Sequence, residues 1–289
     1  MLNMTFRALR MGQVKLFGKS FPNYSIFFLL ITGCTHLPST QERLENATKL
    51  AEDAGWTSET IPTSYFDLQA FLPAQRLKHK RLTILIEGDG LAWISPSKSS
   101  SDPTPLNPVS LKLALAYKPD HAVAYLGRPC QFTSQNEAQC TQKYWTSHRF
   151  SEEVIIATDE AITALKTMTG ASEVQLMGYS GGGAVAALVA SRRVDVARLV
   201  TFAGNLDTTA WTELHQISPL SGSLNPADAV TELQAIPQVH YVGGHDRVIP
   251  AEIVESFHRL LHPKTNSQII IIPEADHRCC WQQVIREMK

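Results

Sequence analysis

The pentapeptide Gly178-Tyr179-Ser180-Gly181-Gly182 has the form G-x-S-x-G and joins an apolar run to an Ala- and Val-rich stretch. The run predicts a strand and the stretch predicts a helix, so the serine is placed at a strand-to-helix turn. Such a turn needs small neighbours, and it exposes the hydroxyl at a helix N-terminus, where the helix dipole favours negative charge. This arrangement favours nucleophilic attack by Ser180. A glycine-rich turn with a bystander serine is the alternative.

A nucleophilic serine needs a base, and the base needs an acid that orients it. The candidate base is His277, which follows the last apolar run of the chain; His240 and His245 are interpreted as structural. Three carboxylates compete for the role of the acid, and each lies at or beyond the end of an expected strand: Asp207, Asp246 and Asp276.

At these residues the sequence resembles the α/β-hydrolase fold family, over essentially all of residues 65–289. The order Ser, Asp, His matches, and so do the positions after strands. The resemblance implies Ser180 as nucleophile, His277 as base and Asp246 as orienting acid. Asp207 stays the rival, because some members carry the acid there. Asp276 is weakest, because neighbouring side chains in an extended loop point apart.

The activity that the resemblance implies is hydrolysis of an acyl bond, an ester first of all, through an acyl-enzyme and without a metal or organic cofactor. A peptidase, thioesterase or acyltransferase would use the same residues. A non-catalytic envelope lipoprotein that keeps the fold as a binding module is the alternative from another class.

The resemblance also locates two backbone N–H groups for an oxyanion hole. One belongs to Gly181, which follows the nucleophile. The other lies in Ile86-Glu87-Gly88-Asp89-Gly90, which stands in place of the family's His-Gly-x turn. Matching the glycines makes Asp89 the donor, with Gly90 as the fallback and an ordinary turn as the alternative. The aspartate is a departure, because its carboxylate opposes an oxyanion unless it points away.

Apolar runs alternate with helical patterns along residues 61–289 and predict one α/β domain, with a mostly parallel central sheet and helices on both faces. The polar segment 41–60 is expected to be a loosely attached arm. Strands are expected at 65–71, 82–86, 121–126, 173–177, 196–202, 238–242 and 268–272. Helices are expected at 111–117, 152–169, 182–192 and 252–261, with a last one from about residue 281.

Three insertions are expected to shape a substrate pocket: residues 91–108, 127–150 and 205–236. Each holds one tryptophan that either lines an apolar pocket or pins the loop: Trp93, Trp145 and Trp211. Three basic residues of the second insertion are interpreted as solvated surface charges, with joint binding of an anionic substrate group as the alternative: Arg128, His148 and Arg149.

Residues 1–33 are typical of a signal peptide, with basic side chains followed by a short apolar run and small residues. Their end, Ile31-Thr32-Gly33, and Cys34 together resemble the lipobox of bacterial lipoproteins. This implies that Cys34 is lipidated and anchors a body that faces the periplasm. Thr35 after the cysteine favours the outer membrane by the same resemblance. Residues 34–60 would then be the anchor and its arm; a plain signal peptide is the alternative.

Export predicts an oxidising compartment, so the remaining cysteines are disulfide candidates. Cys130 and Cys140 enclose nine residues of polar loop and are predicted to be bridged. Cys279 and Cys280 are adjacent, and free buried thiols are expected there. A zinc site made of these two and His277 lacks a second ligand pair at metal spacing, so no metal site is expected.

The charge balance restricts the partners. The chain has 289 residues and a net charge of −1; beyond residue 33, 22 basic and 27 acidic side chains remain. Such a mildly acidic body gives no footprint for nucleic acid. No apolar run approaches the ~20 residues of a membrane-spanning helix, which excludes a multi-pass membrane protein. The expected partners are a small-molecule acyl substrate and a membrane reached through the lipid anchor; the oligomeric state stays open.

Overall fold

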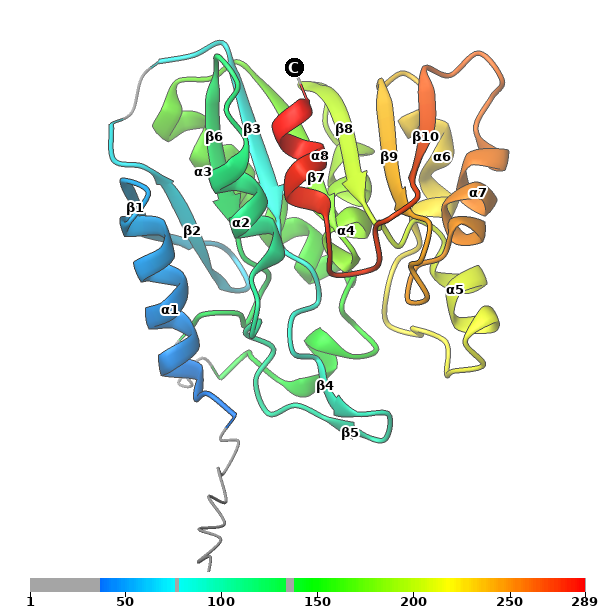
Figure 1. The fold of residues 1–289 in the computed structure, drawn as a ribbon, viewed down its shortest axis with the longest axis horizontal. Coiled ribbons are helices and arrows are strands. Elements are labelled where there is room, and N and C mark those ends of the chain that lie inside the picture. Colours follow the sequence, from blue (N-terminus) through cyan, green and yellow to red (C-terminus); the bar gives the residue numbers. More distant parts are fainter. Residues whose placement is uncertain (1–36, 76–77, 134–137, 289) are drawn as a thin grey trace, which may run out of the picture. The chain divides into compact units, whose positions relative to one another are not determined.

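Eight strands of the described residues form one sheet (Figure 1). The structure is a computed structural model that describes residues 37–75, 78–133 and 138–288. The strands of this sheet are β1 (Trp56–Pro62), β2 (Asp67–Pro73), β3 (Arg81–Ile86), β6 (Ala122–Leu126), β7 (Glu173–Tyr179), β8 (Val196–Phe202), β9 (Gln238–Gly243) and β10 (Ser267–Ile272). Their order is β1-β2-β6-β3-β7-β8-β9-β10. The pairs from β6 to β10 are parallel, and β1 and β2 are antiparallel to their neighbours, so the prediction of a mostly parallel sheet is confirmed.

Helices cover both faces of this sheet. The α-helices are α1 (Thr40–Glu52), α2 (Val109–Ala116), α3 (Glu152–Thr169), α4 (Gly181–Ala190), α5 (Thr208–Leu214), α6 (Val230–Leu233), α7 (Ala251–Leu260) and α8 (Trp281–Glu287). Two short 3₁₀ helices are η1 (Gln142–Trp145) and η2 (Pro226–Ala229). Figure 1 shows α1, α2 and α8 on one face, with α3 and α4 on the other. The helix α7 packs against β9 and β10.

The central strands are buried because both of their faces are covered. Five consecutive apolar or small residues of β3, from Leu82 to Ile86, are buried, as the uninterrupted run predicts. Every residue of α4 is buried as well, which explains its composition of Gly, Ala, Val and Leu. The carboxyl ends of the parallel strands meet at the lower edge of the sheet in Figure 1. This is the edge at which open α/β sheets bind ligands.

The predicted polar arm is instead largely regular structure. Residues 40–52 form α1, which begins with a capping box in which Ser39 and Glu42 exchange hydrogen bonds with each other's backbone N–H groups. The buried Arg43 links α1 to the first insertion, because its Nη2 lies 3.2 Å from a carboxylate oxygen of Asp102. The prediction of an arm was wrong because this helix buries only a narrow stripe, which the polar composition conceals.

Two segments without a clear pattern in the sequence contain short elements. The first insertion carries a separate hairpin made of β4 (Trp93–Ser95) and β5 (Lys98–Ser99), and the third carries α5, η2 and α6. Residues 1–33, predicted to be a signal peptide, and Cys34 lie outside the described residues. Within the described part of the chain, no helix is long and apolar enough to cross a membrane.

Candidate active site

Ser180 lies in the turn from β7 into α4 with φ +53° and ψ −122°, a backbone conformation that L-residues rarely adopt. The flanking glycines make the turn possible. A Cβ on Gly178 would lie 2.2 Å from the carbonyl oxygen of Gly182, and one on Gly182 would lie 2.4 Å from that of Glu87. The strained serine and its small neighbours agree with the turn that the pentapeptide predicts.

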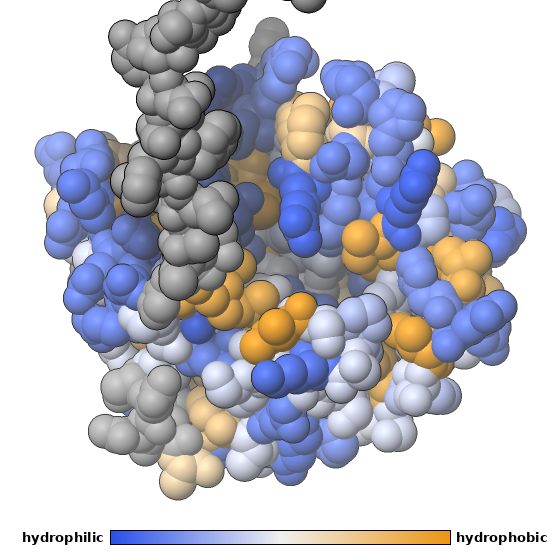
Figure 2. Space-filling view, turned by 60° about the horizontal axis from the view of Figure 1, so that its bottom comes forward, coloured by the Kyte–Doolittle hydropathy of each residue, from blue (hydrophilic) through white to orange (hydrophobic). Residues whose placement is uncertain are grey.

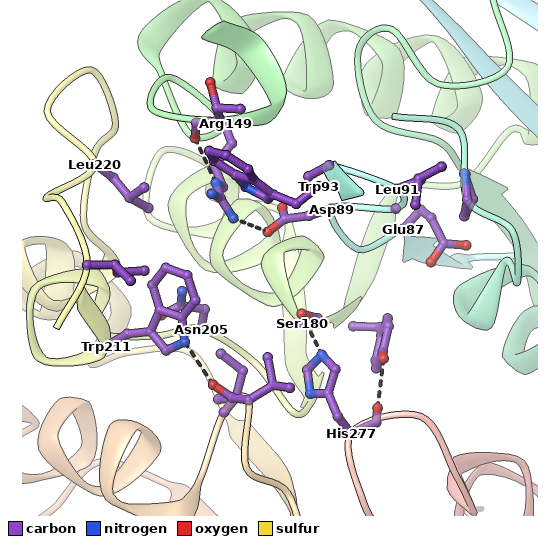
Figure 3. A pocket seen from close by; sticks show the side chains of 18 of the residues that line it. Glu87, Asp89, Leu91, Trp93, Arg149, Ser180, Asn205, Trp211, Leu220 and His277 are labelled. Carbon is purple, nitrogen blue, oxygen red and sulfur yellow. Dashed lines mark hydrogen bonds and ion pairs between the residues drawn. The ribbon is translucent and has the colours of Figure 1, made fainter. Parts of the chain in front are cut away.

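The structure brings Ser180, His277 and Asp246 together. His277 Nε2 lies 3.1 Å from the Oγ of Ser180 (Figure 3), and its Nδ1 lies 2.8 Å from the Oδ2 of Asp246. The Asp246 side chain is fully buried. Its other oxygen accepts the N–H groups of Val248 and Ile249 at 2.8 and 2.9 Å. The carboxylate is therefore held in place on the side of the ring opposite to the serine.

The two rival carboxylates have other partners. Asp207 caps α5, where its Oδ1 accepts the N–H of Ala210 at 3.0 Å and its Oδ2 accepts the hydroxyl of Ser256. Asp276 accepts the N–H of Arg278 at 2.7 Å and that of the next residue, and these bonds lower the pKa of its carboxyl. The ring nitrogens of His277 bond to neither side chain, so one is a helix cap and the other shapes the turn after the histidine.

Two side chains that the sequence analysis missed hold the backbone of His277. The hydroxyl of Tyr179 donates to the His277 carbonyl at 2.7 Å, and the indole Nε1 of Trp281 donates to the same oxygen at 3.1 Å. Tyr179 is the first of the two variable residues of the pentapeptide, and an aromatic beside the serine is the one signal that points to it. Nothing in the local sequence of Trp281 indicates this contact.

The loop after β3 leaves few N–H groups free to meet an oxyanion. The N–H of Gly88 donates to the carboxyl of Glu87 at 3.0 Å, and that of Leu91 donates to the carbonyl of Pro103 at 3.0 Å. Among the described residues, no hydrogen bond takes up the N–H groups of Asp89 and Gly90. These are the two backbone N–H groups that the sequence predicts, as donor and fallback, to complete the oxyanion hole with Gly181.

The carboxylate of Asp89 is paired with two arginines. Arg149 Nη1 lies 2.6 Å from its Oδ2 and Arg128 Nη1 lies 3.4 Å from its Oδ1. Both arginines are buried, so their interpretation as solvated surface charges was wrong; the reason is this shared carboxylate, which compensates for burial. His148 does not join them: it bonds Ser147 and packs on Gly222.

Glu87 is a second carboxyl that the sequence analysis did not single out. It is 2% exposed, and burial raises its pKa to about 7, although the N–H groups of Gly88 and Ser110 donate to it and oppose the shift. It lies at the wall of the pocket (Figure 3). Its place within Ile86–Gly90, the segment expected to form the oxyanion turn, was the available signal.

A cavity of about 1050 Å³ opens in front of Ser180 and His277. All three insertions contribute to its wall, and its apolar lining includes Leu91, Trp93, Leu106, Trp211, Ile217 and Leu220. Figure 2 shows hydrophobic side chains around the hollow on this face. Trp93 and Trp211 line the cavity, whereas the buried Trp145 donates to the carbonyl of Ser100 and pins its loop. Both expected uses of the tryptophans therefore occur.

The four remaining cysteines form two disulfides. Cys130 and Cys140 are bridged across a Cα separation of 5.4 Å, as predicted. Cys279 and Cys280 are bridged to each other, so the expectation of free buried thiols was wrong. The expectation assumed burial, but Cys279 is exposed, and Cys280 has φ +80° in the turn that leads into α8.

The histidine inside β9, His240, is structural, as interpreted. His240 is fully buried, and its Nδ1 lies 2.9 Å from the hydroxyl of Thr201. Burial lowers its pKa to about 3. Among the described residues, no group of three or more His, Cys, Asp or Glu side chains is arranged to hold a metal ion.

Comparison with known proteins identifies a family. A model of the dienelactone hydrolase family matches residues 121–283, more than half of the chain, including Ser180, Asp246 and His277. No curated protein sequence matches the chain.

Solved structures show the same fold. Est1E from Butyrivibrio proteoclasticus superposes with a TM-score of 0.54 at 14% identity, covering 80% of this chain and 96% of its own. An alpha-beta serine hydrolase homologue from Coxiella burnetii gives 0.54 at 14% identity, with coverages of 79% and 95%. Acetyl xylan esterase 1 from Thermoanaerobacterium sp. gives 0.51 at 12% identity, with coverages of 85% and 93%. The chain therefore has the α/β-hydrolase fold.

Proposed function

Because the chain belongs to the dienelactone hydrolase family and is a hydrolase of α/β fold, we propose that it is a serine hydrolase that cleaves a carboxylic ester. One observation carries the proposal: the chain of contacts from Ser180 through His277 to the buried Asp246. The base His277 is oriented by a carboxylate and lies within hydrogen-bond reach of a hydroxyl that lines the cavity from a strained turn. This is the arrangement that activates a serine.

The reaction proceeds in two halves. In the first, Ser180 Oγ attacks the ester carbonyl carbon while His277 Nε2 takes its proton, and Asp246 stabilises the imidazolium that forms. The carbonyl oxygen becomes an oxyanion, which the N–H groups of Gly181 and Asp89 stabilise. The tetrahedral intermediate then expels the alcohol, which receives the proton from His277, and an acyl-enzyme on Ser180 remains. In the second half water attacks that ester by the same steps, which releases the acid and returns the proton to Ser180.

The pocket supports an ester with a bulky apolar part. Leucine, isoleucine, proline and tryptophan side chains form much of its apolar wall, and its volume of about 1050 Å³ exceeds what a small acetyl ester fills. Burial of apolar surface contributes roughly 25 cal/mol per Å², so such a group adds affinity without needing polar partners.

The test is a panel of p-nitrophenyl esters from acetate to laurate, assayed with the purified chain and with Ser180→Ala. We expect turnover that favours medium-length acyl groups and a loss of at least about a thousandfold in Ser180→Ala. Ser218→Ala, a serine on the pocket wall without a histidine partner in the described residues, is the matched control and should retain activity. No hydrolysis by the wild-type chain, or equal rates in both alanine variants, would contradict the proposal.

We further propose that the enzyme is anchored through a lipid on Cys34 and faces the periplasm, in the outer membrane rather than the inner one. The support is the sequence Thr32-Gly33-Cys34-Thr35 after the apolar run. Cys34→Ser should abolish the mass added by acylation and release the body from the membrane fraction. A protein that stays membrane-bound with unchanged mass would contradict the anchor.

A further inference from the structure

Two buried arginines contact the loop that follows β3, Arg149 at the cavity wall, and no step of the proposed reaction uses either of them. Arg128 is 4% and Arg149 is 6% exposed. Burying a guanidinium is unfavourable unless a carboxylate pairs with it. Both converge on the carboxylate of Asp89, Arg149 on one oxygen at 2.6 Å and Arg128 on the other at 3.4 Å; Figure 3 shows the Arg149 pair.

The arginines are themselves fixed by further contacts. The Nη2 of Arg128 donates to the backbone carbonyl of Arg149, and the Nε of Arg149 donates to the carbonyl of Thr146 at 2.8 Å. The guanidinium groups lie over aromatic rings, Arg128 over Phe150 at 5.4 Å and Arg149 over Trp211 at 5.7 Å. The cluster therefore presents its charges to Asp89 from rigid positions.

The carboxylate of Asp89 lies against the residue that follows the nucleophile. A Cβ on Gly181 would lie 2.0 Å from the Oδ1 of Asp89, so only glycine fits there. An unpaired carboxylate at this place would repel the negative charge that develops on the substrate oxygen. With both arginines the group carries a net charge of +1. Burial lowers the pKa of Arg128 to about 10, which leaves it cationic at neutral pH.

We propose that Arg128 and Arg149 are positioning residues of the reaction, which hold the Asp89 carboxylate off the oxyanion and so direct the Asp89 backbone N–H toward it. The inference rests on the proposed function, since it concerns the oxyanion hole of the same site. The pairing also explains why an aspartate is compatible with this turn, although an unpaired carboxylate would oppose an oxyanion. The arginines act through Asp89 and do not touch the substrate oxygen.

The test measures the rate at which a neutral fluorophosphonate phosphonylates Ser180, because the phosphonyl oxygen occupies the oxyanion hole and no natural substrate is needed. Arg149→Met should lower this rate by at least about tenfold. The loss should be smaller than the roughly hundred- to thousandfold loss that follows removal of a whole oxyanion donor. Adding Asp89→Asn to Arg149→Met should restore much of the rate, because it removes the carboxylate that has lost its partner. On p-nitrophenyl butyrate, a neutral ester, the loss in Arg149→Met should appear in kcat with KM nearly unchanged.

Arg193→Met is the matched control, since Arg193 is also nearly buried and pairs with Asp195 and Asp159, but in the segment before β8. It should leave the labelling rate unchanged. Melting temperatures and the final extent of labelling show what fraction of each variant is folded.

Equal losses of rate in Arg149→Met and Arg193→Met, a loss confined to KM, or a further loss on adding Asp89→Asn would overturn the inference. A wild-type chain that does not label at Ser180 would overturn the proposed function as well, whereas normal labelling that Arg149→Met leaves unchanged overturns this inference alone.

Discussion

Both ring nitrogens of His277 have a partner, and the partners decide which nitrogen carries the proton. A carboxylate can only accept, so the Nδ1 that lies 2.8 Å from Asp246 is the protonated one. The Nε2 is then free to accept the hydroxyl proton of Ser180 from 3.1 Å away. The acid thus selects the tautomer that can act as a base.

Asp246→Asn keeps the shape of this contact and removes the charge. We expect kcat to fall by at least about a hundredfold, because an amide can hold the wrong tautomer of the histidine and does not stabilise the imidazolium. In a serine protease the same change lowers kcat by ~10⁴-fold. Asp207→Asn should cost less than about tenfold, since asparagine is also a good helix cap. Ester kinetics on variants with unchanged melting temperature decide, and the reverse order of losses would assign the acid to Asp207.

Glu87 makes stability depend on pH. Its pKa is about 7 in the folded chain against a usual 4.5, so between these values the folded state keeps a proton that the unfolded state loses. The free energy of unfolding therefore falls as pH rises. Relative to Glu87→Gln, the wild-type chain should lose about 2–3 kcal/mol between pH 5 and pH 8, at 1.36 kcal/mol per pKa unit. Urea unfolding at both pH values measures this, with the exposed Glu232→Gln as control; a pH-independent difference between Glu87→Gln and wild type would refute it.

Residues whose roles depend on local signals could be predicted from the sequence. Ser180, His277 and Asp246 each follow a strand, and their chain order and turn chemistry carry the resemblance to the α/β-hydrolase fold family that implies their roles, with Asp207 as the rival acid. The partners of Asp89 could not be predicted, because Arg128 and Arg149 lie 39 and 60 positions away and their burial depends on tertiary packing. Basic residues in a polar loop are usually exposed, so their types alone favour the wrong interpretation.

Among the elements, α4 and β7 determine the position of the nucleophile. The helix begins directly after Ser180 and its first turn lies so close to the end of β3 that a Cβ on Gly182 would lie 2.4 Å from the carbonyl oxygens of Ile86 and Glu87. The same contact brings the helix N-terminus and the oxyanion loop together. Strand, turn and helix thus form one unit that depends on glycines.

Gly182→Ala should disturb that unit. Its Cβ would lie 2.4 Å from two backbone oxygens that cannot move independently, so we expect a loss of about 1–3 kcal/mol in the free energy of unfolding and a slower reaction at Ser180. Gly55→Ala is the control: its φ of +77° also disfavours alanine, but nothing lies within 4 Å. It should lower stability and leave ester turnover unchanged. Full activity in Gly182→Ala would argue against the close contact.

Element prediction succeeded where apolar runs are long. The strands β3 and β8 and the helix α3, with Gly170 in a left-handed conformation after its end, lie within one residue of their expected bounds. It failed at α1, whose buried stripe is narrow, and in residues 205–236, where short helices leave no periodic pattern. In both places tertiary contacts, such as the one between Arg43 and Asp102, stabilise what the local sequence specifies weakly.

At the scale of the whole molecule, the site is assembled from distant segments at one edge of the sheet. Because the strands are parallel, four segments meet there: the loop after β3, the turn after β7 that holds Ser180, and the turns after β9 and β10. The second insertion ties into the same edge: Gln131, beside the Cys130–Cys140 bridge, donates its side-chain amide to the carbonyl of Gly88 at 2.9 Å. The bridge therefore stabilises a loop that supports the oxyanion turn.

Replacing Cys130 and Cys140 together by alanine should lower the free energy of unfolding by about 2–3 kcal/mol, because the bridge closes a loop across a sequence separation of 10. Urea unfolding of this double variant is compared with that of Cys279→Ala/Cys280→Ala, whose bridge closes essentially no loop. Peptide mapping without reductant should show Cys130 linked to Cys140. Free thiols at both positions, or a double variant as stable as wild type, would contradict the prediction.

An activated Ser180 should bond covalently to a fluorophosphonate, so the site at which this probe attaches to the chain tests the proposed function. Intact mass and peptide sequencing after labelling should show one phosphonyl group, on the peptide that contains Ser180. Ser180→Ala should not label, and His277→Ala should label far more slowly, because the hydroxyl has lost its base. An unlabelled wild-type chain, a label on another serine, or equal labelling in His277→Ala would rule out Ser180 as a nucleophile activated by His277.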